Sequence, residues 1–416
     1  MSTLIQKVTI LLFIPLFWVS FIIISFLTLL FQLLQVNKIR AYFRKGQTMA
    51  VLYLEVFPSI NAGYKYRSGC WVSILNEKGF KAKVASIFKL DRHIKFINQP
   101  HFLSLYFLAF CWKRFFQCLS AFNYDLVVVR RELLIFNDYG NLFMEKFLRS
   151  INNKLVLDFD DDISASKHEP RQLSFYGKLM LETPDKFYQS IKQYHYFMTG
   201  TKYLKDKYVP ASNSIDPSRV FILPTLVNYN RYPPKKYDLN KKKLTFGWIG
   251  SPNNYLYLPM VLEPLNKLSE KYDFEFIIIA GKPFEYRTRF DLKQYQWSLK
   301  NELSLLHQID VGVMPLHDNL ISRGKSGFKL IQYMGCGIVS IASGITVINE
   351  IIDDKVDGFI VRDESEWYNV LEEVINSKSK FTQLGYKAFE KIKNNYSFDA
   401  YTEKYINFMK FVKVNT

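Results

Sequence analysis

Three cations surround a Ser-Gly pair in the segment DNLISRGKSGFKLIQYMGCGIVSIAS, residues 318–343. They are Arg323, Lys325 and Lys329, and an apolar run with helical spacing follows before a β-rich segment. The first N–H groups of a helix have no partner inside the helix and carry partial positive charge. Cations beside such a helix N-terminus are typical of an anion site. The segment therefore predicts that the chain binds an anion. The alternative is a solvated basic surface, with Gly327 merely permitting a turn.

Composition and net charge narrow the choice of anion only in part. The chain has 416 residues, of which 49% are hydrophobic, so it can build two domains with complete cores. A formal charge of +17 suits a nucleic acid, an anionic membrane or a phosphorylated substrate. The four cysteines have no paired spacing and the six histidines form no ligand cluster. This argues against a disulfide scaffold or a zinc site and favours a reducing compartment.

The N-terminal segment favours a membrane over a nucleic acid as partner. Residues 8–36 contain no charged side chain and are long enough to cross a bilayer as a helix. Four cations follow in NKIRAYFRKG, whereas only Lys7 precedes the run. The positive-inside rule therefore places the rest of the chain on the cytoplasmic side of the inner membrane. A signal peptide, which would have a shorter apolar region ending in small residues, and a hairpin broken near Pro15 are the alternatives.

A second apolar stretch, residues 101–122, is interrupted by Lys113 and Arg114. Neither side of the interruption is long enough to cross a bilayer. Two interpretations stay open. The stretch is either a helix packed on a sheet or an interfacial helix with its aromatic side chains in lipid and its cations on headgroups.

The remaining segments alternate between β-like apolar runs and helical patterns. Continuous apolar runs are typical of parallel strands covered on both faces. We expect two doubly wound α/β domains, residues 47–227 and 244–395, joined by the Pro-, Tyr- and Lys-rich linker 228–243 and preceded by an anchor in residues 1–46. Ligands bind beyond the carboxyl ends of such strands, so the cleft between the domains is the expected active site. The expected strands are 49–56, 80–86, 125–130, 154–159, 195–200 and 219–224, then 244–250, 274–281, 309–315, 337–342 and 358–361.

Four motifs in the second expected domain resemble a known family. They are FGWIGSPNNYLYL, DVGVMPLHDN, GKSGFKLIQYMGCGIVSIAS and DGFIVRDESEWYNVLEEVI, in this order. Together they resemble the nucleotide-sugar half of the retaining glycosyltransferases of family 4, which have the GT-B fold. In the first domain AGYKYRSG (62–69), VVVRREL (127–133) and LVLDFDDDI (155–163) resemble acceptor-side motifs more weakly.

The resemblance implies an activity and its partners. A hexosyl or related group would pass, with retention, from a UDP- or GDP-sugar to a lipid-linked glycan acceptor in surface polysaccharide biosynthesis. The resemblance implies no cofactor, and a final helix, residues 396–416, that crosses back to the first domain. Two alternatives stay open: a GT-B sugar-nucleotide epimerase, and a catalytically degenerate GT-B protein that acts as a membrane-bound partner.

The resemblance also implies roles for residues in the second domain. Backbone N–H groups of Gly327, Phe328 and Lys329 would face the donor diphosphate. Lys325 and Arg323 would act in catalysis by neutralising the departing nucleotide. The other donor-binding residues implied are Gly250, Ser251, Gln332 and Asn349.

Two positions depart from the family pattern. Gly324 and Gln332 stand where many members carry glutamates that bind the donor sugar and the ribose. The Gln332 amide still offers a donor and an acceptor to a ribose hydroxyl, whereas Gly324 offers no side chain.

On the acceptor side the resemblance implies Gly63, Tyr64, Arg67, Asp160 and Asp161, with Glu132 as a further catalytic residue. Arg67 and Glu132 could instead form an internal ion pair. The acid run DFDDD, residues 158–162, has the oxygen ligands that Mg²⁺ or Mn²⁺ prefers. Because it lies outside the nucleotide half, and because the family needs no metal, we expect no metal site.

Overall fold

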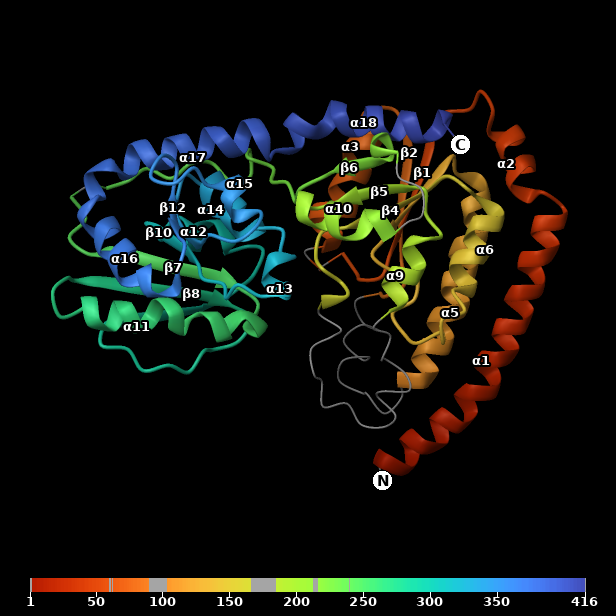
Figure 1. The fold of residues 1–416 in the computed structure, drawn as a ribbon, viewed down its shortest axis with the longest axis horizontal. Coiled ribbons are helices and arrows are strands. Elements are labelled where there is room, and N and C mark those ends of the chain that lie inside the picture. Colours follow the sequence, from red (N-terminus) through yellow and green to blue (C-terminus); the bar gives the residue numbers. More distant parts are fainter. Residues whose placement is uncertain are drawn as a thin grey trace. The chain divides into compact units, whose positions relative to one another are not determined.

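The computed structural model divides the chain into two compact units. Unit 1 consists of Met1–Leu223 with Lys404–Thr416, and unit 2 of Pro224–Glu403. Each unit contains one six-stranded sheet in which all strands are parallel. The chain therefore has the expected α/β architecture of two doubly wound sheets (Figure 1). The residues that the structure describes are 2–59, 61, 63–89, 103–165, 185–211, 216–238 and 240–415.

The sheet of unit 1 has the strand order β2-β1-β3-β4-β5-β6. Alternate residues of each strand face opposite sides, so both faces need apolar side chains. One face packs on α5 (Leu103–Ser120) and α6 (Phe143–Ile151) in a single cluster of buried residues. On the other face Trp71 of α3 (Cys70–Glu77) stacks on Tyr405 of α18 (Phe398–Val414), with ring centroids 3.8 Å apart. The strands are β1 (Ala50–Glu55), β2 (Lys81–Ser86), β3 (Leu126–Arg130), β4 (Leu155–Phe159), β5 (Tyr196–Thr199) and β6 (Val220–Ile222).

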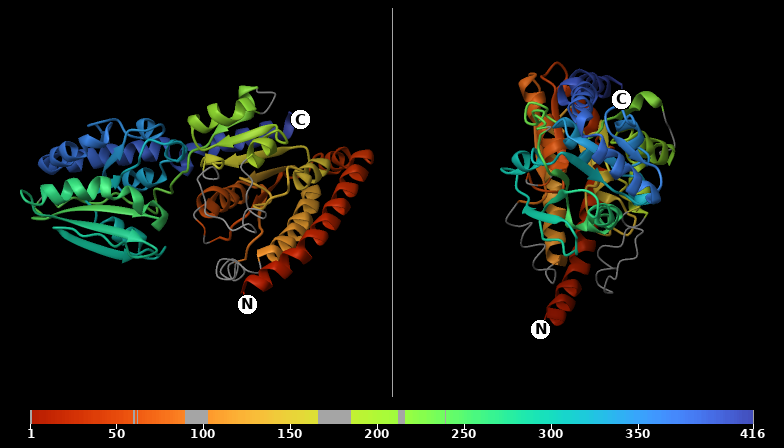
Figure 2. Two further views of the ribbon diagram at one scale, coloured as in Figure 1. Left: turned by 60° about the horizontal axis from the view of Figure 1, so that its bottom comes forward. Right: turned by 90° about the vertical axis from the view of Figure 1, so that its left-hand side faces the viewer.

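The apolar N-terminal segment forms α1 (Ser2–Leu33), followed by α2 (Val36–Arg44). Within α1, Lys7–Leu33 is long and apolar enough to cross a membrane, and it is the one such span among the described residues. Figures 1 and 2 show α1 running beside α5 and α6 of unit 1. The stretch that begins near residue 101 therefore forms a helix, α5, packed between the sheet and α1.

The sheet of unit 2 has the strand order β12-β11-β10-β7-β8-β9. Phe246 and Trp248 of β7 face the helices α11 (Pro259–Leu268) and α16 (Trp367–Asn376). Ile249 faces the other side, which is covered by α12 (Glu302–Leu306), α14 (Phe328–Gly335) and α15 (Ile348–Ile351). The strands are β7 (Leu244–Gly250), β8 (Phe274–Ala280), β9 (Asp291–Gln296), β10 (Val311–Met314), β11 (Val339–Ser343) and β12 (Phe359–Val361), and the other helices are α13 (Leu320–Arg323) and α17 (Phe381–Asn395).

Candidate functional site

The strand order of unit 2 changes direction between β7 and β10. From β7 the chain proceeds outward through β8 and β9, and it then returns to the other side of β7 to add β10, β11 and β12. In open parallel sheets, ligands bind beyond the carboxyl ends of the strands at such a switch point. Gly250 ends β7 and Met314 ends β10, so the segments after these two residues form the candidate site.

Lys329, in the first turn of α14, lies at the end of β7. Its ammonium is 4.0 Å from the ring centroid of Trp248 and 3.1 Å from the position that a Cβ atom would occupy at Gly250. The same Cβ would approach the Trp248 ring to 2.6 Å. Because the contact with the Trp248 ring is too short for a carbon atom and that with Lys329 is tight, glycine at position 250 allows the strand end and the helix to meet in this way.

Lys329 is half-buried, and among the described residues no carboxylate neutralises its ammonium. Burial, and then the nearby charge of Lys325, lower the pKa of Lys329 well below its ordinary value. Among the described residues, no hydrogen bond or ion pair of this ammonium is found. A bound anion would remove this electrostatic cost.

Lys325 reaches the segment that follows β7. Its Nζ donates a hydrogen bond of 2.8 Å to Oδ1 of Asn254 and lies 4.4 Å from the ring centroid of Tyr257. Both partners belong to the 3₁₀ helix Pro252–Tyr257, which begins after the exposed Ser251. The two lysines thus contact residues of β7 and of the turn after it, which lie roughly 70 to 80 positions earlier in the sequence.

Gly327 precedes α14 in the left-handed region, with φ of 68° and ψ of 12°. That conformation favours glycine, and a Cβ atom here would also lie 2.5 Å from Cδ1 of Ile351. The helix that begins at Phe328 points its unpaired N–H groups toward this turn, as any helix N-terminus does. We refer to Gly250, Lys325, Gly327 and Lys329 as the lysine site.

The other donor-side residues predicted from the sequence are more spread out. Arg323 pairs with Asp318 at 2.6 Å, so a carboxylate shares its charge. Gln332 is buried, and its Nε2 is 3.5 Å from the Tyr232 hydroxyl. Asn349 donates a hydrogen bond of 3.2 Å to the carbonyl of Gly344.

A cavity of about 470 Å³ lies at the carboxyl ends of β10, β11 and β12. Its polar lining includes Ser343, His317 and Glu364, and Nδ1 of His317 is 2.5 Å from Oε1 of Glu364. Ser343, His317 and Glu364 were not among the residues predicted from the sequence. Their position directly after expected strands was the available signal, since that is where ligands of parallel sheets bind.

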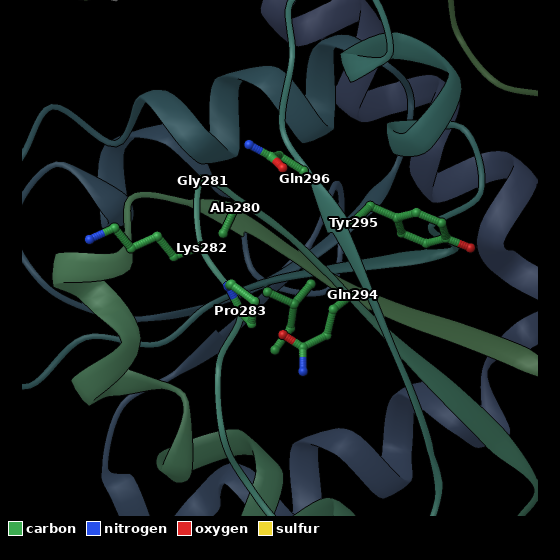
Figure 3. A pocket seen from close by; sticks show the side chains of 8 residues that line it. Ala280, Gly281, Lys282, Pro283, Gln294, Tyr295 and Gln296 are labelled. Carbon is green, nitrogen blue, oxygen red and sulfur yellow. The ribbon is translucent and has the colours of Figure 1, made fainter. Parts of the chain in front are cut away.

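A smaller cavity of about 90 Å³ lies at the carboxyl ends of β8 and β9 (Figure 3). Gln294 borders it, and its amide is used twice by the loop after β8: it accepts from the N–H of Phe284 at 2.7 Å and donates to the carbonyl of Phe284 at 2.8 Å. Tyr295 points away from Gln294, across β9 (Figure 3). The amide of Gln294 therefore fixes the wall of the cavity.

The carboxyl edge of the unit 1 sheet carries a network of opposite charges. Arg67 is paired with Asp158, Arg130 with Asp160 at 2.5 Å, and Arg131 with Asp160 at 3.1 Å and with Asp161 at 2.5 Å. Burial alone would raise the pKa of Asp160, but Arg130 and Arg131 hold it well below its ordinary value. These six residues form what we call the guanidinium–carboxylate network.

The network shows where the acceptor-side residues lie. Arg67 is an internal ion-pair partner, although of Asp158 and not of Glu132. Gly63 lies beside the network, since a Cβ atom there would be 3.6 Å from Nη2 of Arg130. Tyr64 begins the π-helix Tyr64–Gly69, which carries Arg67.

Arg130 and Arg131 were missed, although the motif VVVRREL contains them. Arg131 has a φ of 63°, which is unusual for a residue other than glycine and turns its side chain back toward Asp160. Glu132, the residue selected from the motif, is buried, and its N–H donates to the carbonyl of Arg130 at 2.9 Å. Within the described ranges, no group of three His, Cys, Asp or Glu side chains is placed to hold a metal ion.

Comparisons with known proteins agree with this geometry. Residues 243–377 match a family model described as glycosyl transferases group 1. A comparison with curated proteins found no match.

Among solved structures, a glycosyltransferase from Rickettsia africae is similar with a TM-score of 0.63 at 13% identity, over 89% of this chain and 100% of that one. Sucrose-phosphate synthase from Thermosynechococcus elongatus gives 0.61 at 11% identity, over 88% and 100%. The Anabaena protein Alr3699/HepE in complex with UDP and glucose gives 0.58 at 11% identity, over 87% and 100%. The chain therefore has the GT-B fold, and most of its second unit matches the glycosyl transferases of group 1.

Proposed function

We propose that the chain is a retaining glycosyltransferase of family 4 type whose donor is a nucleoside diphosphate sugar. The observation that carries this proposal is the half-buried ammonium of Lys329, which lies in the first turn of α14 beside Trp248 and has a lowered pKa. A diphosphate supplies the missing negative charge. The Anabaena neighbour was solved with UDP and glucose, which supports a sugar nucleotide as the ligand class.

The lysine site has the chemistry needed to assist departure of the nucleotide. Negative charge grows on the diphosphate as the bond to the sugar breaks. The ammonium groups of Lys325 and Lys329 and the N–H groups at the start of α14 are fixed in place before the reaction, so they need little reorganisation when that charge develops. Arg323 is tied to Asp318 and adds a weaker, shared charge.

The proposed acceptor is a lipid-linked glycan intermediate of a surface polysaccharide, reached from the inner face of the cytoplasmic membrane. The apolar α1 and the net charge of +17 support a location at an anionic membrane. The guanidinium–carboxylate network at the carboxyl edge of the unit 1 sheet supports acceptor contacts by Gly63, Tyr64, Arg67, Asp160, Asp161 and Glu132. We propose that turnover needs no cofactor and no metal ion.

A binding screen followed by an activity assay tests the proposal. We expect UDP or GDP to raise the unfolding temperature of the full chain, and the corresponding sugar nucleotides to be consumed in the presence of membrane lipids. Lys329→Ala should weaken nucleotide binding, whereas Lys271→Ala, which removes an exposed lysine paired with Glu372, should not. Absence of binding by all nucleoside diphosphates would falsify the donor assignment.

A catalytically degenerate binding protein is the second candidate. The observation that favours it is Gly324, which has no side chain where many family members carry a glutamate. Nucleotide binding without turnover on any lipid-linked acceptor would support this candidate over the transferase.

A further inference from the structure

One stripe of α1 is packed along unit 1. The buried residues Ile10, Phe13, Phe17 and Ile24 recur at intervals of three, four and seven, which places them on one face of a helix. Phe17 meets Phe136 and Phe143 with ring centroids 6.2 and 5.8 Å away. Further along, Phe31 lies 5.7 Å from Phe147 of α6. The 18 steps from Phe13 to Phe31 correspond to about 27 Å of helix.

Polar residues on the packed stripe are satisfied within α1. The hydroxyl of Ser20 donates to the carbonyl of Leu16, and that of Thr28 to the carbonyl of Ile24, both at 2.8 Å. These side chains are small, so they let α1 approach its neighbours closely. The packed stripe therefore has the features of a helix–helix contact along most of the length of α1.

The outward face of α1 is apolar and uncovered. From Leu11 to Leu30, every exposed residue has an apolar side chain, including Ile22 at 63% and Phe26 at 64% exposure. A helix that is hydrophobic all round is normally buried on all sides. Unit 1 covers only one stripe of α1, so the outward face needs another apolar environment.

The neighbouring helix α5 extends this surface. Leu105, Ala109, Trp112 and Phe116 recur on one face of the helix, and Trp112 also packs against the core of unit 1. Leu105, Ala109 and Phe116 are exposed, and Trp112 is half-buried. Two adjacent helices therefore both expose apolar stripes. Together these stripes form a larger exposed apolar surface than the single apolar side chains that are normal on a protein surface.

The packing of α1 is incompatible with a span across a bilayer. A spanning helix is surrounded by about 30 Å of hydrocarbon. If the docked α1 crossed the bilayer, α5 and α6 would enter it too, with the exposed Lys146 of α6. A lysine in hydrocarbon is costly, whereas the same residue remains in water when α1 lies along the surface.

The charges around the outward face match an anionic surface. No acidic residue precedes Glu55, while Lys7, Lys38 and Lys45 are exposed near the two ends of α1. Arg40 and Arg44 of α2 are used differently: Arg40 donates to the carbonyl of Tyr124 at 2.7 Å, and Arg44 pairs with the carboxylate of residue 125 at 2.7 Å. The internal contacts fix α2 to unit 1, and the exposed lysines remain for anionic headgroups.

We propose that α1 lies flat in the interface of an anionic phospholipid bilayer, with its outward face among the acyl chains and unit 1 docked on its other side. Unit 1 takes the place of the polar face that an interfacial helix usually carries. This inference rests on the proposed membrane location of the protein and is independent of sugar transfer. It replaces a perpendicular anchor with a helix that holds unit 1 against one leaflet.

Depth measurements on the full chain test the orientation. Leu12, Val19, Phe26 and Leu33 are all more than half exposed and lie seven residues apart, so each step moves a label about 10.5 Å along the helix. A nitroxide at each position in turn is measured in vesicles of phosphatidylglycerol and phosphatidylcholine. We expect the four labels to lie at similar, shallow depths. Shallow depths at Leu12 and Leu33 with deep ones between them would show a spanning helix and overturn the proposal.

The side of the membrane from which each end of α1 can be labelled provides a second test of the orientation. In a Cys70→Ser background, Lys7→Cys and Lys45→Cys are treated with a membrane-impermeant maleimide, since the other three cysteines are buried. A flat helix makes both positions reactive from the same side of the membrane, and a spanning helix makes them reactive from opposite sides.

Partition into the same vesicles measures the outward face itself. The double variant Ile22→Lys, Phe26→Lys should lower the partition coefficient at least about tenfold. Tyr386→Lys, at an exposed residue of α17 in unit 2, should leave it unchanged. If the wild-type chain forms dimers and does not bind the vesicles, a second copy of the chain covers this face, and the proposal is overturned. Sugar-nucleotide binding is measured on the same samples, so failure of the flat orientation is distinguished from failure of the proposed donor site.

Discussion

The carboxyl edges of the two sheets differ in how their cationic side chains are paired. In unit 1, Arg67, Arg130 and Arg131 are each paired with carboxylates of the guanidinium–carboxylate network. In unit 2, the ammonium of Lys329 is half-buried near Lys325, and its pKa is lowered. The cations of the first edge have carboxylate partners, whereas Lys329 has none among the described residues. Paired charges indicate a preformed framework, and an unneutralised charge indicates where a ligand adds the missing ion.

Removing a carboxylate from the network should produce the largest loss of stability. Asp158→Ala removes the carboxylate that pairs with the buried guanidinium of Arg67, which costs about 3–5 kcal/mol. For a unit of this size, that lowers the unfolding temperature by roughly 2–4 °C per kcal/mol. Asp161→Ala is the matched control, because its side chain is 47% exposed and should cost about 1 kcal/mol or less. Equal losses in both variants, measured by circular dichroism, would contradict the contrast between buried and exposed pairs.

Removing the ammonium of Lys329 should have the opposite effect on stability and a large effect on activity. Lys329→Met removes a charge that folding disfavours, so the unfolding temperature should stay constant or rise. The lost contact to the diphosphate costs about 1.5–3 kcal/mol, or roughly tenfold to more than a hundredfold in kcat/KM. Steady-state kinetics and thermal unfolding of one preparation give both values. A variant that is both destabilised and fully active would remove Lys329 from the donor site.

Nucleotide binding should be linked to proton uptake at Lys329. The pKa of its ammonium is lowered in the free protein and should rise when a diphosphate binds, so binding takes up protons where the free lysine is partly neutral. Affinity should therefore fall as pH rises through the pKa of the free lysine. Calorimetric titrations with UDP above pH 7.5, in two buffers of different ionisation enthalpy, measure the uptake. Lys329→Met should abolish the part of the uptake that belongs to the lysine, and an unchanged value would assign it elsewhere.

Chelation should have the smallest effect. The carboxylates of Asp158 and Asp160 are already occupied by guanidinium groups, so they have little capacity left for a cation. We expect kcat/KM to be unchanged after treatment with EDTA. Loss of activity that Mn²⁺ restores would show that the acid run holds a metal and that the two edges are less different than their ion pairs indicate.

The sequence predicted the buried strands well, but it did not predict the exposed edge strand β9. In β8, FEFIIIA is apolar except for the half-buried Glu275, because helices cover both faces of the sheet there. In contrast, β9 has the sequence DLKQYQ and lies at the sheet edge, where four of its six residues are exposed. A hydrophobic pattern in the sequence indicates burial. A polar edge strand, which has a neighbouring strand on one side only, therefore resembles a loop in its sequence pattern. The segment expected as a linker likewise contains Tyr237, whose hydroxyl accepts from the N–H of Val339 at 2.8 Å.

The part of the candidate site that lies in one local segment could be predicted from the sequence. Lys325, Gly327 and Lys329 lie within five positions, and a helix N-terminus after a strand is visible in the sequence. The contact of Lys329 with Trp248 depends on two segments about 80 positions apart, and no local pattern contains it. For the same reason, the partners of Arg130 and Arg131 could be found only once β3 and β4 were paired.

The path of the chain also has a consequence for biosynthesis. The chain leaves unit 1 at Leu223 and re-enters it at Lys404, so the whole of unit 2 is inserted into the first unit. Tyr405 stacks on Trp71 and shares a hydrogen bond with the Tyr53 hydroxyl, and both contacts belong to the second face of the unit 1 sheet. While the ribosome is still making unit 2, that face lacks α18, and the unit that emerges first is the last to be completed.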